Sequence, residues 1–332
     1  MTSIQEIVVG DIGGTHARYA IAGIAGGRVV SLSDPVTLLT RDHVSLATSW
    51  EAFARRLGRD LPRAAALAVA CPVMGETLKL TNNPWVIRPG ALRQELGVEA
   101  VTLVNDFGAV GHAVAALEPQ HFSHLAGPDQ VLPESGVITV IGPGTGLGVA
   151  HVLRRAGQVH VIECEGGHID FAPLDALEDA ILARLRSRFA RVSVERIVSG
   201  PGLLNLYEAL AAIEGRPVTV RDDKLLWALA VSGADSLAAA ALQRFCLSLG
   251  AVAGDLALAQ GASAVVVAGG IAPRIASLLP GSGFAQRFAA KGRFEMMMAA
   301  MPIKLITHPY PGLLGAAAAF AGKEGLLFVN KK

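Results

Sequence analysis

Two stretches of the sequence share one plan: an apolar, strand-like run, a glycine-rich turn that contains threonine, and a second strand-like run. They are VVGDIGGTHARYAIAG at 8–23 and TVIGPGTGLGVAHVLR at 139–154. A plan that occurs twice predicts two related halves that face each other across a cleft. Two unrelated hairpins that merely look alike would leave the same pattern, so the repeat needs further support.

The remaining pattern fits an α/β protein. The chain has 332 residues, 52% of them hydrophobic, which is enough for two domains. Apolar strand-like runs alternate with Ala- and Leu-rich stretches, as is typical of helices that cover buried sheets. We expect helices at 44–57, near 90–96 and at 235–258, and strands at 7–10, 17–22, 29–32, 64–70, 100–104, 137–141, 148–153, 159–162 and 264–268.

Charge, hydropathy and cysteine usage argue against several classes of protein. The formal net charge is +1 without a basic run, so neither nucleic acid nor an anionic membrane is expected as a partner. The start, MTSIQEIVVGD, lacks the charged and apolar regions of a secretory signal, and the longest apolar runs are too short to span a membrane. Cys71, Cys164 and Cys246 form no CxxC pair, which favours reduced thiols in the cytoplasm over disulfides or zinc.

Glycine-rich turns expose backbone N–H groups and are suited to holding phosphate. The Walker pattern is absent from the sequence, the GxGxxG pattern fails, and a strand follows each turn where those sites need a helix. The turns therefore read as hairpin phosphate clamps, although ordinary hairpin loops remain the alternative. Asp11 would need a cation beside a phosphate, and Mg²⁺ held through water fits that need. The nucleotide-site candidates in the turns are Asp11, Gly13, Gly14, Thr15, Gly142, Gly144, Thr145 and Gly146.

A series of motifs runs in order along nearly the whole chain: DIGGTHAR, LTNNPW, LVNDF, GPGTGLG, ECEGGHIDF, SVERIVSGPGLLNLYEAL, VVVAGGIAPR and PGLLGAAAAF. Together they closely resemble the bacterial ATP-dependent glucokinases of the hexokinase and actin-like superfamily. No cysteine-rich zinc motif follows His168, so the resemblance is to the non-zinc group. The chain departs from the family pattern at His16, where Asn is frequent, and this puts any side-chain contact from that position in doubt.

The resemblance implies two ribonuclease-H-like α/β domains around a central cleft, a small one of 1–116 plus 308–332 and a large one of 117–307. It also implies that ATP, with Mg²⁺, phosphorylates glucose to glucose 6-phosphate, an early step of glycolysis in the cytoplasm. A homodimer is expected for such an enzyme.

The same resemblance assigns roles to individual residues. Asp106 is the general base that takes the proton of the sugar's 6-hydroxyl. Gly269 and Gly270 lie against the adenosine, and the stretch at 199–210 forms another wall of that pocket. Glu163 and Asp170 flank the sugar motif and receive no role. Trp85 lies in the sugar loop, and Asn82 is an alternative to Asn83. The sugar would be bound by Asn83, Asn105, Asp106, Glu165, His168 and Glu195.

Other interpretations stay open at this point. Taken singly, Asp106 reads as a helix cap, His168 as a structural histidine, and Glu165 and Glu195 as solvated acids. A kinase of mannose, fructose or an amino sugar would use the same mechanism. A non-catalytic sugar sensor usually carries a DNA-binding segment, for which we expect no room before the first turn. An actin-like filament or chaperone ATPase does not explain the EGGH motif.

Overall fold

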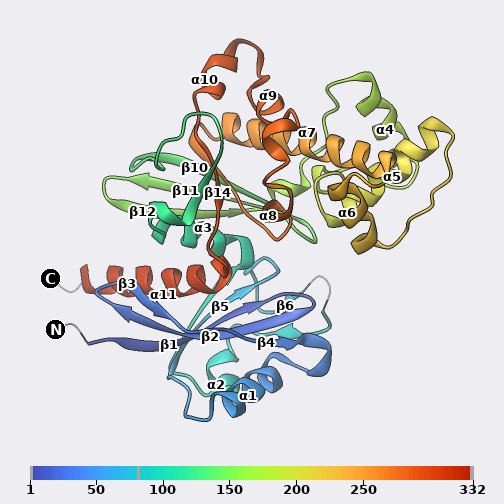
Figure 1. Cartoon of the computed structure of the whole chain (residues 1–332). Coiled ribbons are helices and arrows are strands. Elements are labelled where there is room, and N and C mark those ends of the chain that lie inside the picture. The colour runs from blue at the N-terminus through green and yellow to red at the C-terminus, as the bar shows by residue number, and fades with distance from the viewer. Residues whose placement is uncertain (1–2, 81–82, 330–332) are drawn as a thin grey trace. The chain divides into compact units, whose positions relative to one another are not determined.

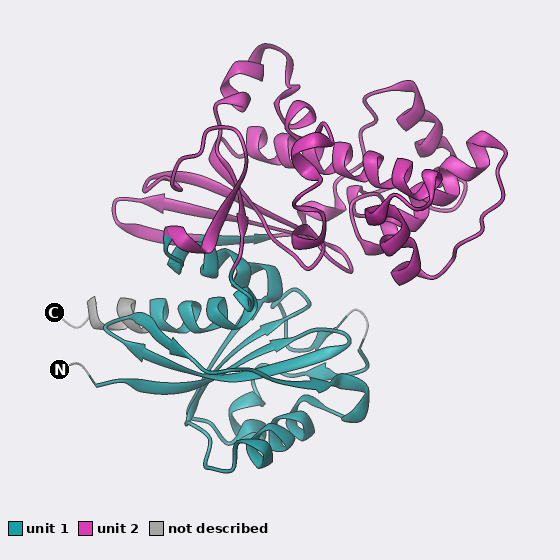
Figure 2. Cartoon of the chain, in the orientation of Figure 1, with its two compact units in different colours: residues 1–118, 161–163, 308–332 teal, residues 119–160, 164–307 magenta. Residues whose placement is uncertain are grey.

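The computed structural model describes residues 3–80 and 83–329, and the side chains within these ranges up to residue 323. The chain forms two compact units, each discontinuous in sequence (Figure 2). Unit 1 consists of 1–118, 161–163 and 308–332, and unit 2 of 119–160 and 164–307. The domain limits expected from the sequence stay a prediction.

Unit 1 contains a mixed sheet with helices on both faces (Figure 1). Its elements are β1 (Gln5–Ile12), β2 (His16–Ala25), β3 (Arg28–Leu32), β4 (Val36–Leu39), a 3₁₀ turn (Thr40–Asp42), α1 (Leu46–Leu57), β5 (Ala64–Val69), β6 (Leu78–Lys79), β7 (Val86–Ile87), α2 (Leu92–Leu96), β8 (Ala100–Asn105), α3 (Asp106–Ala116) and α11 (Pro311–Val329).

The strand order is β3-β2-β1-β5-β8, and β4 pairs with β2. The strands β1, β5 and β8 are parallel, and β2 runs antiparallel to its neighbours. Side chains alternate between the two faces, as the pleat of a strand requires. Val8 and Ile12 join the core beneath α1 and α2, whereas Ile7 and Val9 pack with α11. Figure 1 shows α11, in red, lying along the sheet.

Unit 2 contains a second sheet and most of the helices. Its elements, with β12 passing through both units, are β9 (Phe122–Ala126), β10 (Gly136–Pro143), β11 (Leu147–Arg155), β12 (Gln158–Cys164), α4 (Ala176–Arg186), α5 (Gly200–Glu214), α6 (Asp223–Ser232), α7 (Ser236–Ala259), β13 (Ala262–Val267), α8 (Ala272–Ile275), α9 (Phe284–Ala289), α10 (Glu295–Ala299) and β14 (Ile303–Ile306); short 3₁₀ turns lie at Pro119–His121, Gly166–His168, Val194–Arg196, Leu279–Gly281 and Gly292–Phe294.

The second sheet repeats the order of the first. Its strands run β12-β11-β10-β13-β14-β9. In this sheet β10 is antiparallel to β11 and parallel to β13, as β1 is antiparallel to β2 and parallel to β5 in the first. The two glycine-rich hairpins therefore occupy equivalent places in two sheets of like topology. This arrangement confirms the α/β, ribonuclease-H-like fold class that the sequence predicts.

Helix α7 is the longest helix of unit 2. By length and composition it could cross a membrane, the one such helix among the residues that the structure describes, but 72% of its most apolar stretch is buried inside the protein. Asp235 caps its first turn by accepting a hydrogen bond from the N–H of Ala238 at 2.7 Å. It packs against α5, α6 and α9, so its apolar composition is that of a core helix.

Several elements differ from the sequence prediction. Helix α1 begins at Leu46 rather than at 44, because Ser45 caps it with a reciprocal capping box. The strands β4, β9 and β14 were not predicted; each has four or five residues, too few for a clear alternation. Helix α3 was also missed. Its residues are apolar on nearly every side, so the sequence carries little amphipathic contrast there.

Candidate active site

The first phosphate hairpin joins β1 to β2 in unit 1. The N–H of Gly13 donates to the carbonyl of His16 at 2.9 Å, which closes the turn. Thr40, the residue directly after β4, supports it from outside: its hydroxyl donates to the carbonyl of Gly14 at 2.7 Å and its N–H to that of Thr15 at 3.0 Å. Thr15 itself is exposed. The turn is thus held through its carbonyls, which leaves the Thr15 hydroxyl at the surface.

Asp11 lies near the end of β1, directly before this turn. In the ladder it stands opposite Arg18, whose Nη1 is 3.5 Å from Asp11 Oδ2. Burial raises the pKa of Asp11, and the charge and hydrogen bond of Arg18 act against that rise. A Cβ on Gly312, at the start of α11, would lie 3.0 Å from Asp11 Cγ. The carboxyl group therefore lies against a helix N-terminus, where negative charge is favoured.

The donors at Asp11 are compatible with Mg²⁺ but not with a closed metal cage. Within residues 3–80 and 83–329 no three His, Cys, Asp or Glu side chains gather as metal ligands. Mg²⁺ usually keeps several waters and takes one or two carboxylates together with phosphate oxygens. A single carboxylate beside a glycine-rich turn fits that requirement.

The motif LVNDF places Asn105 and Asp106 at the junction of β8 and α3. Asn105 is the helix cap: its Oδ1 accepts the N–H groups of Phe107 and Gly108 at 2.9 and 3.1 Å, and its Nδ2 donates to the carbonyl of Cys71 at 3.3 Å. Asp106 is therefore the first residue of α3 and not its cap. Burial and, secondarily, the charge of Asp106 raise the pKa of the Cys71 thiol.

In the TNNPW loop the side chain of Trp85 is fully bonded, whereas that of Asn83 keeps one N–H group without a partner in the described part of the chain. Trp85 is 1% exposed, and its indole N–H donates to the carbonyl of His43 at 2.9 Å. Asn83 Oδ1 accepts the N–H of Trp85 at 2.9 Å. Its Nδ2 is buried and has no hydrogen-bond partner in the described part of the chain. A buried amide without a partner is costly unless a ligand uses it. Asn82, the alternative to Asn83, lies outside the described residues.

The second phosphate hairpin, between β10 and β11, is the centre of unit 2. The N–H of Gly144 donates to the carbonyl of Gly146 at 2.8 Å, and Gly144 in turn accepts from the N–H of Gly200 at 2.7 Å. Gly200 is the first residue of α5, whose cap Ser199 accepts the N–H of Gly202 at 3.1 Å. The hairpin turn and the N-terminus of α5 are thus directly joined.

The two glycines after β13 have different surroundings. Gly269 has φ +81°, and a Cβ there would lie 2.5 Å from the carbonyl oxygen of Pro143 in the hairpin. Both the conformation and the close approach require glycine. A Cβ on Gly270 would meet no atom within 4 Å. Gly269 therefore fixes the turn against the hairpin, and Gly270 offers an open backbone surface for a ligand.

The sugar motif follows β12 as the 3₁₀ turn Gly166–His168. A Cβ on Gly167 would lie 2.2 Å from the carbonyl oxygen of Leu147. The two glycines, Gly166 and Gly167, permit close packing against β11. This packing leaves Glu165 and His168 outward, 60% and 55% exposed, with Oε2 and Nε2 4.0 Å apart. The two side chains can therefore reach one ligand.

Glu195 connects the sugar motif to the phosphate hairpin. Its Oε2 accepts the N–H of Leu147, the residue after the turn, at 2.9 Å. A Cβ on Gly146 would lie 2.4 Å from the same oxygen, so a larger residue would displace the carboxylate. Ser199 donates its hydroxyl to the carbonyl of Glu195 at 2.7 Å. The carboxylate of Glu195 is thus bonded to the phosphate hairpin, and its backbone carbonyl to the cap residue of α5.

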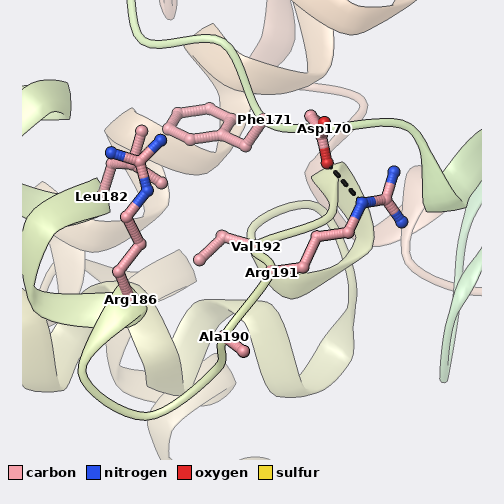
Figure 3. Close-up of a pocket in the computed structure, with 7 residues that line it drawn as sticks. All are labelled: Asp170, Phe171, Leu182, Arg186, Ala190, Arg191 and Val192. Carbon is pink, nitrogen blue, oxygen red and sulfur yellow. Dashed lines mark ion pairs between the residues drawn. The ribbon is translucent and has the colours of Figure 1, made fainter.

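A short pairing of segments places Glu195 near the sugar motif. The N–H of Val194 donates to the carbonyl of Ile169 at 2.9 Å, and Asp170 forms a bridge with Ser193. Beside this pairing is a cavity of about 230 Å³, where Asp170 and Arg191 form an ion pair of 2.6 Å (Figure 3). None of the predicted site residues lines that cavity. Its lining is Asp170, Phe171, Leu182, Arg186, Ala190, Arg191 and Val192.

The structure brings the predicted residues together as two groups, one in each unit. Three residues without a predicted role contact them. Thr40 holds the first hairpin, Gly312 leaves room for Asp11, and Glu163 Oε1 accepts the N–H of Asn105 at 3.0 Å. Each contact joins parts of the chain far apart in sequence, so no local pattern signals it. The role of every predicted residue in binding stays a prediction.

The comparisons with known proteins agree with this arrangement. The chain resembles a glucokinase structure from an Antarctic psychrotroph with a TM-score of 0.83 and 34% identity, over 96% of this chain and 99% of the other. A glucokinase of the ROK family from Streptomyces griseus, solved with glucose and AMPPNP, shares the fold at 20% identity, with a TM-score of 0.61 over 96% of this chain and 99% of the other. The fold and these comparisons define a sugar kinase of the actin-like ATPase class.

The sequence comparisons identify the family. The sequence model of the family described as Glucokinase matches residues 8–323. A curated Glucokinase from Zymomonas mobilis subsp. mobilis (strain ATCC 31821 / ZM4 / CP4) is 64% identical over 319 residues, which are 96% of this chain and 98% of the relative. The chain belongs to the glucokinase family.

Proposed function

We propose that the protein transfers the γ-phosphoryl group of ATP to the 6-hydroxyl of D-glucose, which gives glucose 6-phosphate and ADP. The observation that carries this proposal lies within unit 2. Glu195 accepts the N–H of Leu147, directly after the phosphate turn, and Gly167 packs on the carbonyl of the same residue. The candidate sugar residues thus contact Leu147, the residue directly after the candidate phosphate turn. Phosphoryl transfer requires donor and acceptor to be held in this way.

In this proposal Asp106 is the general base. A sugar hydroxyl is a weak nucleophile at neutral pH, and a positioned carboxylate contributes roughly 10²–10⁴-fold in rate. Its place in the first turn of α3 favours the negative charge. The other polar candidates hold the sugar through its hydroxyls, for which Asn83 offers an unused buried N–H. The proposed sugar ligands are Asn83, Asn105, Asp106, Glu165, His168 and Glu195.

The two hairpins hold the triphosphate. Their exposed hydroxyls, on Thr15 and Thr145, and their glycine N–H groups are donors of the kind that phosphoryl oxygens accept. Gly269 and Gly270 lie against the adenosine in this proposal. The residues concerned are Gly13, Gly14, Thr15, Gly142, Gly144, Thr145, Gly146, Gly269 and Gly270.

We propose that Asp11 holds Mg²⁺ through water. When bound with ATP, the ion would neutralise part of the charge of the phosphates. The residues of this chain supply the carboxylate, the adjoining turn and the helix N-terminus that orient the carboxylate.

We further propose that the protein acts in the cytoplasm, within glycolysis, as a homodimer. The three cysteines are free, which suits a reducing compartment. Light scattering of the purified protein would measure the dimer directly; a mass equal to one chain across the working concentrations would reject it.

The test is ATP consumption by the purified protein with glucose, mannose, fructose and glucosamine, and without sugar. We expect turnover with glucose that far exceeds the sugar-free rate. In Asp106→Asn, glucose binding should persist while kcat falls by roughly 10²–10⁴-fold. A folded Asp106→Asn protein with nearly normal turnover would contradict the role of Asp106. Turnover with another hexose in preference to glucose would reassign the substrate.

A further inference from the structure

Two acids, Glu163 and Asp170, flank the sugar motif, and their carboxylates have different partners. Asp170 directs its carboxylate to Arg191, 2.6 Å away in an exposed ion pair. Glu163 instead directs Oε1 to the backbone N–H of Asn105 at 3.0 Å. The chain enters unit 1 for only three residues here, Val161–Glu163, before it returns to unit 2. Glu163 is thus the last residue of this three-residue segment and precedes Glu165 by two positions.

The surroundings of Glu163 are shaped to receive it. A Cβ on Gly108, in the first turn of α3, would lie 2.4 Å from Glu163 Oε1 and 2.6 Å from its Cγ. The side chain therefore lies flat over Gly108, in space that a larger residue would fill. The hydrogen bond is made at the end of β8, since Asn105 is the last residue of that strand to pair with β5. Beyond this pair the backbone must be fixed by other groups.

We propose that Glu163 is a positioning residue for phosphoryl transfer, whose carboxylate fixes the backbone of Asn105 and thereby the direction of Asp106. The inference rests on the proposed function. Asn105 already caps α3 with its own side chain. The bond from Glu163 is exposed, so it adds little to the stability of the fold. It acts where β8 ends and α3 begins, directly before Asp106, the residue proposed to take the proton of the sugar hydroxyl. A displacement of about 1 Å at such a point can cost roughly a hundredfold in rate.

The first test compares Glu163→Ala with Glu163→Gln. Alanine removes the acceptor, so kcat with glucose should fall about tenfold to a hundredfold while the KM for ATP and the Tm stay close to wild type. Glutamine keeps an acceptor oxygen at the same reach and should retain most of the activity. Asp170→Ala, which removes the other flanking acid and the same charge, should keep the wild-type kcat.

The second test uses the steric contact. Gly108→Ala should push the Glu163 side chain aside and lower kcat, although alanine is the better helix former. In a Glu163→Ala background the space is empty, and the same substitution should cost almost nothing further. A Gly108→Ala effect of equal size in both backgrounds would contradict the inference. So would a wild-type kcat in Glu163→Ala, or a loss in Glu163→Gln as large as that in Glu163→Ala.

These outcomes separate the inference from the function on which it rests. An active wild-type protein with an unaffected Glu163→Ala variant rejects the positioning role alone. A wild-type protein that phosphorylates none of the hexoses rejects the proposed function and the positioning role with it.

Discussion

Asn83 and Asn105 belong to the same unit and use their amide oxygens in the same way, to accept backbone N–H groups of the next turn. Their amide nitrogens differ. Asn105 Nδ2 donates to Cys71, whereas Asn83 Nδ2 has no partner within the described residues. Because a buried donor without a partner destabilises the folded chain, Asn83 is the residue whose geometry points most directly to a bound hydroxyl.

Asn83→Ser tests that role. Serine can still accept the N–H of Trp85, more weakly, but it removes the unpaired amide donor. Leaving one buried sugar hydroxyl without its partner costs roughly 1–3 kcal/mol. We therefore expect the Kd for glucose, measured by calorimetry, to rise by roughly 5-fold to 150-fold. Thermal melting should show that the fold is kept. Unchanged glucose affinity in a folded Asn83→Ser protein would remove Asn83 from the site.

At this scale the sequence predicts residue types better than contacts. The turn glycines and the Asn105–Asp106 pair stand out locally, because a glycine or a polar pair after an apolar strand is unusual. Which of the pair caps α3 required the structure. The packing of Gly167 was not predicted, since its close neighbour Leu147 is not adjacent in sequence. Glu163 and Thr40 were missed for the same reason: their partners are 58 and 26 positions away.

Among the elements, α3 and α11 of unit 1 cross at close range. A Cβ on Gly315 of α11 would lie 1.7 Å from the carbonyl oxygen of Ala109 in α3. The obstacle is backbone, which cannot rotate away as a side chain could. The crossing therefore depends on glycine for its distance and not for its conformation.

Gly315→Ala should accordingly destabilise the protein by at least roughly 1–3 kcal/mol, the usual cost of overpacking. Gly322 lies in the same helix, and a Cβ there would meet no atom within 4 Å. Gly322→Ala should be neutral or stabilising by up to about 1 kcal/mol, because alanine favours the helix. Urea denaturation of both variants provides the comparison. Equal free energies of unfolding for the two would contradict the close crossing.

His112 of α3 makes the stability of unit 1 sensitive to acid. Burial, assisted by the charge of Lys323, lowers its pKa from 6.5 to about 4. The folded chain thus keeps His112 neutral where the unfolded chain binds a proton. The stabilisation is complete above pH 6.5 and is lost as the pH falls from 6.5 towards 4. The loss attributable to this residue is roughly 2–3 kcal/mol.

Comparing the thermal stability of wild type and His112→Gln between pH 4.5 and 7.5 measures this effect. The wild-type protein should lose more stability on acidification than the variant does. His160→Gln, at an exposed position of β12, provides the control and should follow the wild type. Parallel stability curves for wild type and His112→Gln would show that His112 does not contribute.

The elements themselves were predicted unevenly. The two hairpins are marked by glycine-rich turns between apolar runs, and α7 by the length of its Ala- and Leu-rich run, and the structure confirms all three elements. The strands β9 and β14, which pair with each other, have only five and four residues, so their sequences show no comparable pattern. A helix such as α3, apolar on most sides, is recognised only from the neighbours that bury it.

On the scale of the whole molecule, each unit is assembled from separate parts of the chain. The sheet of unit 1 comes from the first 105 residues, yet one of its faces is covered by α11 near the other end. Ile7, Val9 and Phe320 belong to that shared core. The apolar surface of the first sheet is therefore completed only by the last helix.

A chain truncated after Thr307 should lose the solubility of the full protein, because one apolar face of the first sheet would be open to water. The soluble fraction on expression, and dye binding by any soluble product, measure the effect. Limited proteolysis should digest the first 118 residues of the truncated chain but not those of the full one. A protease-resistant fragment of that size from the truncated chain would show that α11 is dispensable.

The position of α11 in the sequence also sets an order of events on the ribosome. The strands of the first sheet leave the exit tunnel well before the helix that shields one of its faces. Folding of the first unit must wait through the synthesis of some two hundred further residues, during which its bare face is available to chaperones or to another nascent chain. Synthesis of α11, rather than emergence of the first part of the chain, is thus the event that allows this unit to close.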